Sequence, residues 1–360
     1  MENKRVLFLV PYPHGVSPSQ RFRLELYEAT MQEEGVEYVY APFLSESVYP
    51  IFFEPGNTFK KALGIISGYF RRYGQLFRMR RYNVVWVHRE TAPMALFPFY
   101  NFLLTKCFGK NVVFEMDDAV WMPNVSSANA KFQWLKPFKN SLRMMKWAKT
   151  VVCGNEFLRQ KALEYNENAT LLPTGVDTAL VHNQEQNQQS EHVRVGWTGS
   201  HSTLPYLEKI VPILKELYPT RPFQLVVISD VEPQLDFPDV NYIPWNKITE
   251  IADLLRFHIG LMPIPNKEWT EGKCGLKIIQ YQSLGIVPIA SPFGVNKELI
   301  GNNERGLLVN DLNDWKNKLD FLLRNEGIRT SYAAKCRPFI LEHYSIQSQR
   351  DKFLHLLEED

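Results

Sequence analysis

The sequence has few cysteines, no long apolar run and almost no net charge. Its four cysteines lie far apart and form no CxxC pair, which argues against a zinc site or a disulfide framework: Cys107, Cys153, Cys274 and Cys336. No apolar signal segment follows the first charged residues. The longest apolar stretch, residues 92–105, contains two prolines and is too short to cross a bilayer. We therefore expect a cytoplasmic protein with reduced thiols.

The small net charge of +2 conceals an uneven distribution. Residues 1–180 contain 22 Lys and Arg against 16 Asp and Glu, so the remaining half is acidic. A basic half suggests an anionic partner or surface there. The 45% hydrophobic content excludes a disordered chain, and 360 residues suffice for two ordinary domains.

Short β-rich runs alternate with helical stretches throughout the chain, as in parallel α/β sheets. We predict strands at 6–10, 84–87, 112–115, 150–153, 170–172, 193–197, 224–229, 241–243, 259–262, 287–290 and 306–309. We predict helices at 21–34, 59–81, 92–107, 132–147, 156–165, 276–284 and 346–358.

A polar segment, residues 183–192, interrupts this alternation and has the composition of a linker. It divides the sequence into an expected first domain, 1–185, and second domain, 186–360, with a last helix able to pack on either. The predicted fold is α/β, with two Rossmann-like domains whose parallel sheets face across a cleft. Ligands of such sheets bind beyond the carboxyl ends of the strands.

The most informative segment is 269–298, WTEGKCGLKIIQYQSLGIVPIASPFGVNKE. Gly272 and Gly275 flank Lys273, and a predicted helix begins near Leu276. Glycines allow close approach of the backbone, while a helix N-terminus and a lysine both attract an anion such as a diphosphate. Lys277 either adds a second charge or points to solvent.

This segment resembles the retaining GT-B glycosyltransferases of family 4. The family has a Gly-rich loop, a helix with a Glu-x7-Glu motif and a following Gly-x-Pro-Val-Ile-Ala strand; KCGLKIIQYQSLGIVPIASPFGVNKE follows that order. The second motif glutamate, which binds the donor ribose, falls on Gln280. The first falls on Gly272, with Glu271 one residue early. The resemblance implies a nucleotide-diphosphate-sugar donor, UDP- or GDP-linked, and no further cofactor.

Two other loops of the second half match donor-binding loops of the family. VRVGWTGSHST (193–203) contains Gly199, Ser200 and His201 after a strand, and Ser202 or Thr203 is placed to cap the next helix. In NYIPW (241–245), the resemblance places Pro244 and Trp245 beside the nucleotide base. An ordinary turn and a core tryptophan remain equally good interpretations.

In the first half, the segment after the first strand, PYPHGVSPSQRFR, resembles the family's glycine loop on the acceptor side. Gly15 and Arg21 are the candidates there, with Arg21 and Arg23 as surface residues being the alternative. A second loop places His88, Arg89 and Glu90 directly after a strand. A lone histidine is more often structural than catalytic, so both interpretations stay open.

VVFEMDDAVW (112–121) places three carboxylates at a strand end. The family often has a His-Asp pair here, which touches the transferred sugar or the acceptor, and Asp117-Asp118 takes its place. Glu115 and Asp117 would share one face if the strand continued. A metal site is a less favoured alternative, since lysines and helix dipoles replace the metal in this family.

The resemblance implies a metal-independent, hexosyl-transferring enzyme of polysaccharide biosynthesis that retains anomeric configuration. The expected catalytic residues are Lys273, Asp117, Asp118 and His88. A nucleotide-sugar epimerase of the same fold and a non-catalytic nucleotide-sugar-binding protein remain alternatives.

Two basic-aromatic stretches, 59–82 and 131–149, suit peripheral attachment to an anionic membrane and an acceptor that is a glycan or is lipid-linked. Five arginines are candidates for that attachment: Arg71, Arg72, Arg78, Arg80 and Arg81. Solvated helix faces are the alternative, and no nucleic-acid partner is expected because no nucleic-acid-binding motif accompanies them.

Overall fold

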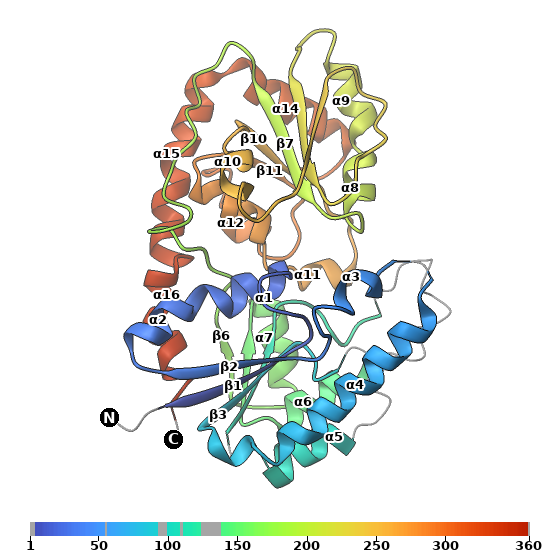
Figure 1. The fold of residues 1–360 in the computed structure, drawn as a ribbon. Helices are drawn as coiled ribbons and strands as arrows, with labels where there is room; N and C mark the ends of the chain where they lie inside the picture. The colour runs from blue at the N-terminus through green and yellow to red at the C-terminus, as the bar shows by residue number, and fades with distance from the viewer. Residues whose placement is uncertain (1–3, 55, 93–98, 109–110, 124–137, 359–360) are drawn as a thin grey trace. The chain divides into compact units, whose positions relative to one another are not determined.

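The computed structural model describes residues 4–54, 56–92, 99–108, 111–123 and 138–358. It divides into two compact units. Unit 1 comprises residues 1–174 with 349–360, and unit 2 comprises residues 175–348. Each contains a six-stranded parallel sheet with helices between its strands (Figure 1).

The sheet of unit 1 has the strand order β2-β1-β3-β4-β5-β6. Its strands are β1 (Arg5–Val10), β2 (Glu37–Pro42), β3 (Val84–His88), β4 (Val112–Met116), β5 (Thr150–Cys153) and β6 (Ala169–Leu171). β3 and β4 are buried along their whole length, as the unbroken apolar runs predicted. The strand order reverses between β1 and β3, so the loops after these strands diverge and leave room for a ligand.

The helices of unit 1 are α1 (Pro18–Arg23), α2 (Glu28–Glu33), α3 (Tyr49–Phe52), α4 (Thr58–Leu76), α5 (Phe99–Phe102), α6 (Lys139–Trp147) and α7 (Glu156–Leu163). The helix predicted at 21–34 is therefore broken: Leu24, with φ −127°, leaves the helical region, and a 3₁₀ turn follows before α2. The predicted helices at 92–107 and 132–147 lie partly outside the described residues.

The last helix, α16 (Ile346–His355), leaves unit 2 and packs on unit 1. Phe353 is fully buried, and its ring stacks on Tyr27 with a centroid separation of 4.0 Å. Trp86 on β3 also contacts the Phe353 ring. The end of the chain therefore completes the core of the unit that the beginning of the chain forms.

Unit 2 has the strand order β12-β11-β10-β7-β8-β9, which reverses between β7 and β10. Its strands are β7 (Arg194–Gly199), β8 (Gln224–Ser229), β9 (Val240–Pro244), β10 (Ile259–Met262), β11 (Val287–Ala290) and β12 (Leu307–Leu308). All six strands predicted in this half are confirmed to within two residues at each end, because their apolar runs are short and end at turn residues.

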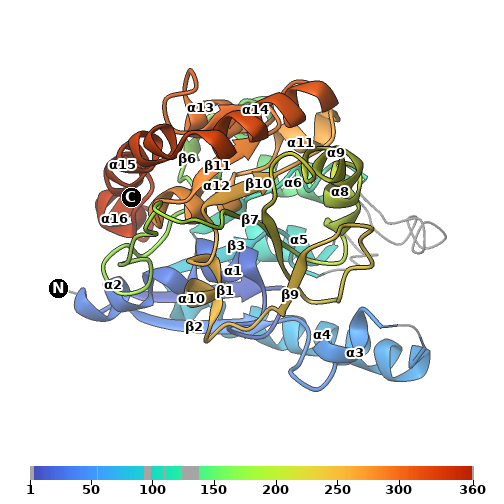
Figure 2. The ribbon, with the colours of Figure 1, turned by 90° about the horizontal axis from the view of Figure 1, so that it is seen from above.

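Helices cover both faces of the unit 2 sheet (Figure 2). They are α8 (Leu204–Glu208), α9 (Val211–Leu217), α10 (Glu250–Leu254), α11 (Glu268–Glu271), α12 (Leu276–Ser283), α13 (Asn296–Ile300), α14 (Leu312–Arg324) and α15 (Glu326–His343). Leu225 and Val227 on β8 pack in one core with α9 and α14 residues, while Val226 and Ile228 pack in the other with Leu254 and Tyr281. This alternation of side chains fixes the register of the central strands.

Among the described residues, no helix has the length and apolar character that crossing a bilayer requires. Nor does any group of three or more His, Cys, Asp or Glu side chains in the described ranges come close enough to hold a metal ion.

Candidate functional site

In unit 2, the loop between α11 and α12 turns sharply at Gly275, directly before the first turn of α12. Gly275 has φ +70°, a left-handed conformation that disfavours side chains. A Cβ added there would lie 2.5 Å from Leu299 Cδ1 and 2.6 Å from Val295 Cγ2. The glycine is thus required both for the turn and for the close approach to α13. This turn leaves the first N–H groups of α12 without partners inside the helix.

Two lysines accompany that helix N-terminus, and each lies over a tryptophan ring. Lys273 Nζ is 3.8 Å from the centroid of Trp269, and Lys277 Nζ is 4.4 Å from that of Trp197. Burial and then the positive charge of Lys273 lower the pKa of Lys277 to about 7. Both cations would gain from an anion beside them, and the repulsion between them would fall. Neither tryptophan contact was predicted.

A second cluster of unit 2 joins Trp245 and Gln280 through a shared acceptor, Glu250. The Oε1 atom of Glu250 accepts from Trp245 Nε1 at 3.2 Å and from Gln280 Nε2 at 3.5 Å. Trp245 follows β9, Glu250 begins α10, and Gln280 lies one turn into α12. Pro244 ends β9 and is exposed. The sequence suggested Trp245 and Gln280 as ligand contacts but gave no signal for Glu250.

The other predicted donor residues lie at the end of β7 and just after it: Gly199 ends the strand, and Ser200 and His201 follow. A Cβ on Gly199 would lie 2.5 Å from the Trp197 ring, so only glycine fits. His201 is exposed, and its Nδ1 lies 2.7 Å from Asp230 Oδ2. The expected helix cap is wrong, because Thr203, the residue before α8, bonds the carbonyl of Ser200 instead.

Glu271 and Gly272 lie in contacts that hold the loop around Lys273 in place. Glu271 Oε2 accepts a 3.0 Å bond from the backbone N–H of Gly294, in the turn after β11. Gly294 has φ +58°, and a Cβ there would lie 2.7 Å from the carbonyl of Lys273. Gly272 is buried at the end of α11. The carboxylate of Glu271 therefore stabilises the loop that contains Lys273.

In unit 1, five side chains form a continuous polar network at the carboxyl ends of the strands. Arg23 Nε donates to Glu115 Oε1 at 2.7 Å, and the other oxygen of Glu115 is bonded to His88 Nδ1. His88 Nε2 lies 2.9 Å from Ser19 Oγ, which also bonds Asp117 Oδ2. His88 and Glu115 have no exposed surface, and Arg23 is 2% exposed. The interpretation of Arg23 as a surface residue is wrong, because it neutralises a buried carboxylate.

The network also orients the hydroxyl group of Ser19. If Asp117 is ionised, it can only accept, so the Ser19 proton points to Asp117. His88 Nε2 must then donate to Ser19 Oγ. Ser19 thereby links the His88 ring to the Asp117 carboxylate.

Asp117 and Asp118 both contact Arg89 rather than facing opposite sides, because β4 ends at Met116. Arg89 Nε is 3.4 Å from Asp117 Oδ1, and an Arg89 terminal nitrogen is 3.5 Å from Asp118 Oδ2. Burial would raise the pKa of Asp117, but the charges of Arg89 and then His88, with the Ser19 bond, hold it well below its usual range. Asp117 is therefore an ionised, partly buried carboxylate.

Arg89 itself has φ +61°, an uncommon conformation for a non-glycine residue. Its backbone N–H donates to the carbonyl of Glu115 at 2.8 Å, and the next N–H, of Glu90, donates to His88 O at 2.7 Å. These bonds and the two aspartates stabilise the strained residue. Such strain concentrates at functional sites.

The loop after β1 is held by Glu25, a residue that the sequence did not suggest. The N–H of Gly15 donates to both Glu25 oxygens, at 2.9 and 3.0 Å, and Gln20 Nε2 donates to Oε1 at 2.7 Å. Gly15 has φ +80°, as its turn requires. Arg21 is half-buried, with its guanidinium over the Phe22 ring at 5.1 Å. The predicted residues of unit 1 thus lie on the loops after three neighbouring strands, β1, β3 and β4.

Comparison with solved structures identifies the architecture. A glycosyltransferase from Rickettsia africae ESF-5 superposes with a TM-score of 0.69 over 99% of this chain and 98% of that one, at 15% identity. HepE from Anabaena, solved with UDP and glucose, gives 0.65 over 99% of both chains at 10% identity. Sucrose-phosphate synthase from Thermosynechococcus elongatus gives 0.65 over 98% of both at 13% identity. No family model and no curated protein sequence matches the chain.

Proposed function

We propose that this chain, which has the GT-B fold, is a glycosyltransferase that moves a hexosyl group from a nucleotide-diphosphate sugar to an acceptor hydroxyl. The observation that carries the proposal is the pair Lys273 and Lys277 at the start of α12, directly beside the left-handed turn at Gly275. Two cations and a helix N-terminus provide what a departing diphosphate needs, namely fixed positive charge where negative charge develops.

The other residues that we propose to contact the donor also belong to unit 2. Gln280 and Glu250 are placed to bind ribose hydroxyls, one as donor and one as acceptor, and Trp245 and Pro244 to flank the base. The narrow loop at Gly199, with Ser200 and His201, would admit the phosphates or the sugar. Because HepE has been solved with UDP and with UDP-glucose, we propose a uridine donor first and a guanosine donor second.

The acceptor is assigned to unit 1, as a glycan or a lipid-linked precursor. Asp117, ionised and held by Arg89 and Ser19, is the carboxylate best placed to accept a hydrogen bond from a hydroxyl group. Asp118, Glu90 and His88 complete the polar surroundings. We propose transfer with retention and without a metal ion, with the lysines stabilising the leaving diphosphate.

The test is a thermal-shift screen of the whole chain against UDP, GDP, ADP, TDP and their sugars. A ligand that binds only the folded protein raises the melting temperature by mass action. In the Lys273→Ala variant we expect the shift with the preferred diphosphate to be lost and the weaker shift with its nucleoside to remain. Lys209→Ala, at an exposed lysine of unit 2, is the matched control.

Two results would contradict the proposal. Absence of any shift with all four diphosphates would remove the donor site, and equal losses for diphosphate and nucleoside would remove Lys273 from the phosphates. Product analysis then separates transfer from epimerisation, since an epimerase converts its donor without any acceptor. Activity that is abolished by EDTA and restored by manganese would overturn the metal-independent mechanism.

A further inference from the structure

Helix α4 of unit 1 presents a row of large apolar side chains to solvent. Phe59, Leu63, Ile66 and Phe70 are 75%, 49%, 50% and 76% exposed. Their spacing of i, i+4, i+7 and i+11 places them on one face of the helix. Phe77, directly after the helix, is 78% exposed and continues the row. We call these five residues the α4 stripe. Helix α4 lies on the outside of its unit (Figures 1 and 2).

The stripe is not the packing face of α4, because the opposite face already packs against unit 1. That face consists of Gly64, Gly68, Arg72 and Leu76, all buried. A Cβ on Gly64 would lie 2.6 Å from Val48, and one on Gly68 would lie 2.8 Å from Phe43. The glycines therefore allow the helix to pack closely against the loop after β2. Because this face of α4 is packed against unit 1, the stripe on the other face points to solvent.

Arg72 fixes the rotation of the helix further. Its guanidinium donates to the carbonyls of Thr91, Ala41 and Val10 at 2.6–2.7 Å, while only 1% of the residue is exposed. Burial lowers its pKa to about 10, which still leaves it charged at neutral pH. Arg72 is thus a structural residue, and its assignment to a membrane-facing basic group is corrected.

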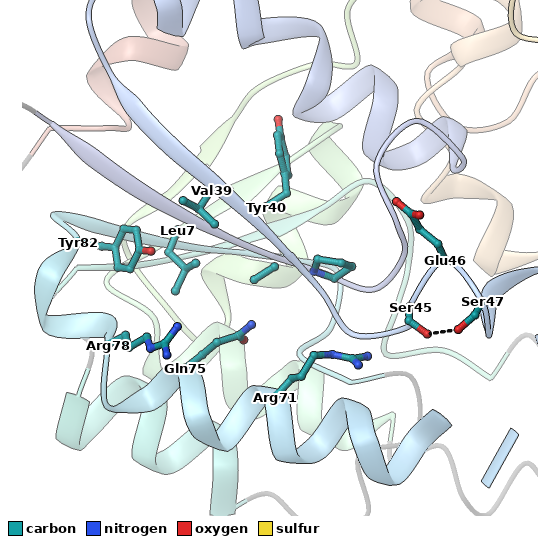
Figure 3. A pocket seen from close by; sticks show the side chains of 12 residues that line it. Leu7, Val39, Tyr40, Ser45, Glu46, Ser47, Arg71, Gln75, Arg78 and Tyr82 are labelled. Atoms are coloured by element: carbon teal, nitrogen blue, oxygen red, sulfur yellow. Dashed lines mark hydrogen bonds between the residues drawn. The ribbon is translucent and has the colours of Figure 1, made fainter. Parts of the chain in front are cut away.

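Within the segment that contains α4, the charged residues are all basic. Residues 55–89 contain eight Lys and Arg and no Asp or Glu. Lys60, Arg71, Arg78, Arg80 and Arg81 are exposed. Arg71 and Arg78 line a pocket of about 640 Å³ between α4 and the edge strand β2, together with Gln75, Ser45, Ser47 and one acidic residue, Glu46 (Figure 3). The side of α4 next to the stripe therefore offers basic and hydroxyl groups suited to phosphates.

We propose that the α4 stripe is a membrane-docking surface, which inserts its apolar side chains into the interface of an anionic bilayer while the flanking basic residues contact lipid phosphates. An exposed apolar face bordered by cations is the pattern of helices that lie in the membrane interface. A second copy of this chain is a poorer occupant, because it would bring the same uncompensated positive charge against this one. The inference rests on the proposed function, because it gives the transferase a membrane on which to act. Docking itself does not depend on nucleotide binding at the donor site.

The experiment is flotation of the whole chain with phosphatidylcholine vesicles and with vesicles containing phosphatidylglycerol. We expect binding to the anionic vesicles only, weakened by salt because the attraction acts over about 10 Å at 0.1 M. The variant Phe59→Gln, Leu63→Gln, Ile66→Gln and Phe70→Gln should lose it. Leu180→Gln with Ile248→Gln, at residues 73% and 91% exposed in unit 2, is the matched control and should bind as the wild type does.

A second variant tests the charges without touching Arg72. Neutralising Arg78, Arg80 and Arg81 to Gln should lower the partition coefficient by about fivefold for each arginine. The nucleotide-induced thermal shift is measured on every variant, so a failure of docking is distinguishable from a failure of the donor site. Failure of the wild type to float with anionic vesicles at low salt would overturn the proposal. So would retained binding by the stripe variant, or an oligomer that dissociates in that variant.

Discussion

The pairing of Gln280 with Glu250 yields a sharp prediction about a conservative substitution. On sequence grounds, Gln280→Glu should preserve ribose binding, since family 4 enzymes have glutamate there. In the structure, however, the Gln280 amide lies 3.5 Å from Glu250 Oε1. The substitution would replace a donor with a second carboxylate at that separation. We therefore expect Gln280→Glu to destabilise unit 2 at neutral pH and to weaken nucleotide binding.

The size of the effect follows from the distance and the exposure. Two like charges about 4 Å apart repel by about 4 kcal/mol at an effective dielectric of about 20. Glu250 is only half-buried, so solvent reduces the loss to about 1–2 kcal/mol of unfolding free energy. The repulsion raises a carboxyl pKa in the folded state, so the folded state binds a proton more tightly than the unfolded state does. The cost is therefore full above the raised pKa and disappears below about pH 4.

The assay is urea unfolding followed by far-UV circular dichroism between pH 4 and pH 8, with calorimetric titration of UDP alongside. The decisive control is the charge swap, Gln280→Glu with Glu250→Gln, which restores one amide and one carboxylate. We expect the swap to recover most of the stability lost by the single variant. If Gln280→Glu unfolds like the wild type at pH 8, or if the swap is as unstable as the single variant, the assigned contact is wrong.

Three further predictions concern single residues. Because burial and Lys273 lower the pKa of Lys277 to about 7, a bound diphosphate should raise that pKa, so binding takes up part of a proton and weakens as pH rises above 7. In titration calorimetry the observed heat should then vary with the ionisation enthalpy of the buffer, and observed heats that are equal in all buffers would contradict the prediction. Asp117→Asn should lower the rate of transfer at least about tenfold and leave donor affinity unchanged, and a normal turnover rate would show that Asp117 is structural. The variant should also lose the stability that the ionised carboxylate supplies above about pH 4, which the wild type loses only as pH falls through the depressed pKa of the folded state. Gly275→Ala should cost about 1–3 kcal/mol through its left-handed φ and its contact with Leu299, measured by urea unfolding, and an unchanged midpoint would show that the turn adapts.

The strands of both sheets were predictable, because buried parallel strands appear as short unbroken apolar runs between turn residues. The exception is β2, which was not predicted. Its residues alternate between exposed and partly buried, since it is the edge strand of the unit 1 sheet. The helices α14 and α15 were also missed; α15 contains Pro338, which argues against a helix in a sequence.

The candidate site was predictable where the backbone determines it and not where side chains meet from distant segments. Gly275 and Gly199 could be recognised from the sequence, since a turn and a close approach both require glycine. The partners that give the charged residues their properties lie far away along the chain. Glu115 meets Arg23 across 92 residues, and Glu250 meets Gln280 across 30. Spacing within one segment carries no signal for such pairs.

The return of the last helix to unit 1 affects how the protein is made. Residues 349–358 supply Phe353, which fills the space beside Tyr27 and Trp86, and the side chain of Asn111 bonds the carbonyl of Glu358. A ribosome adding about 5–20 residues per second finishes residue 174 roughly 10–40 s before it supplies that helix. During this interval the nascent N-terminal sheet has an uncovered aromatic surface, available to chaperones or to aggregation. All the strands of unit 2, the last of which ends at Leu308, are translated before that helix as well.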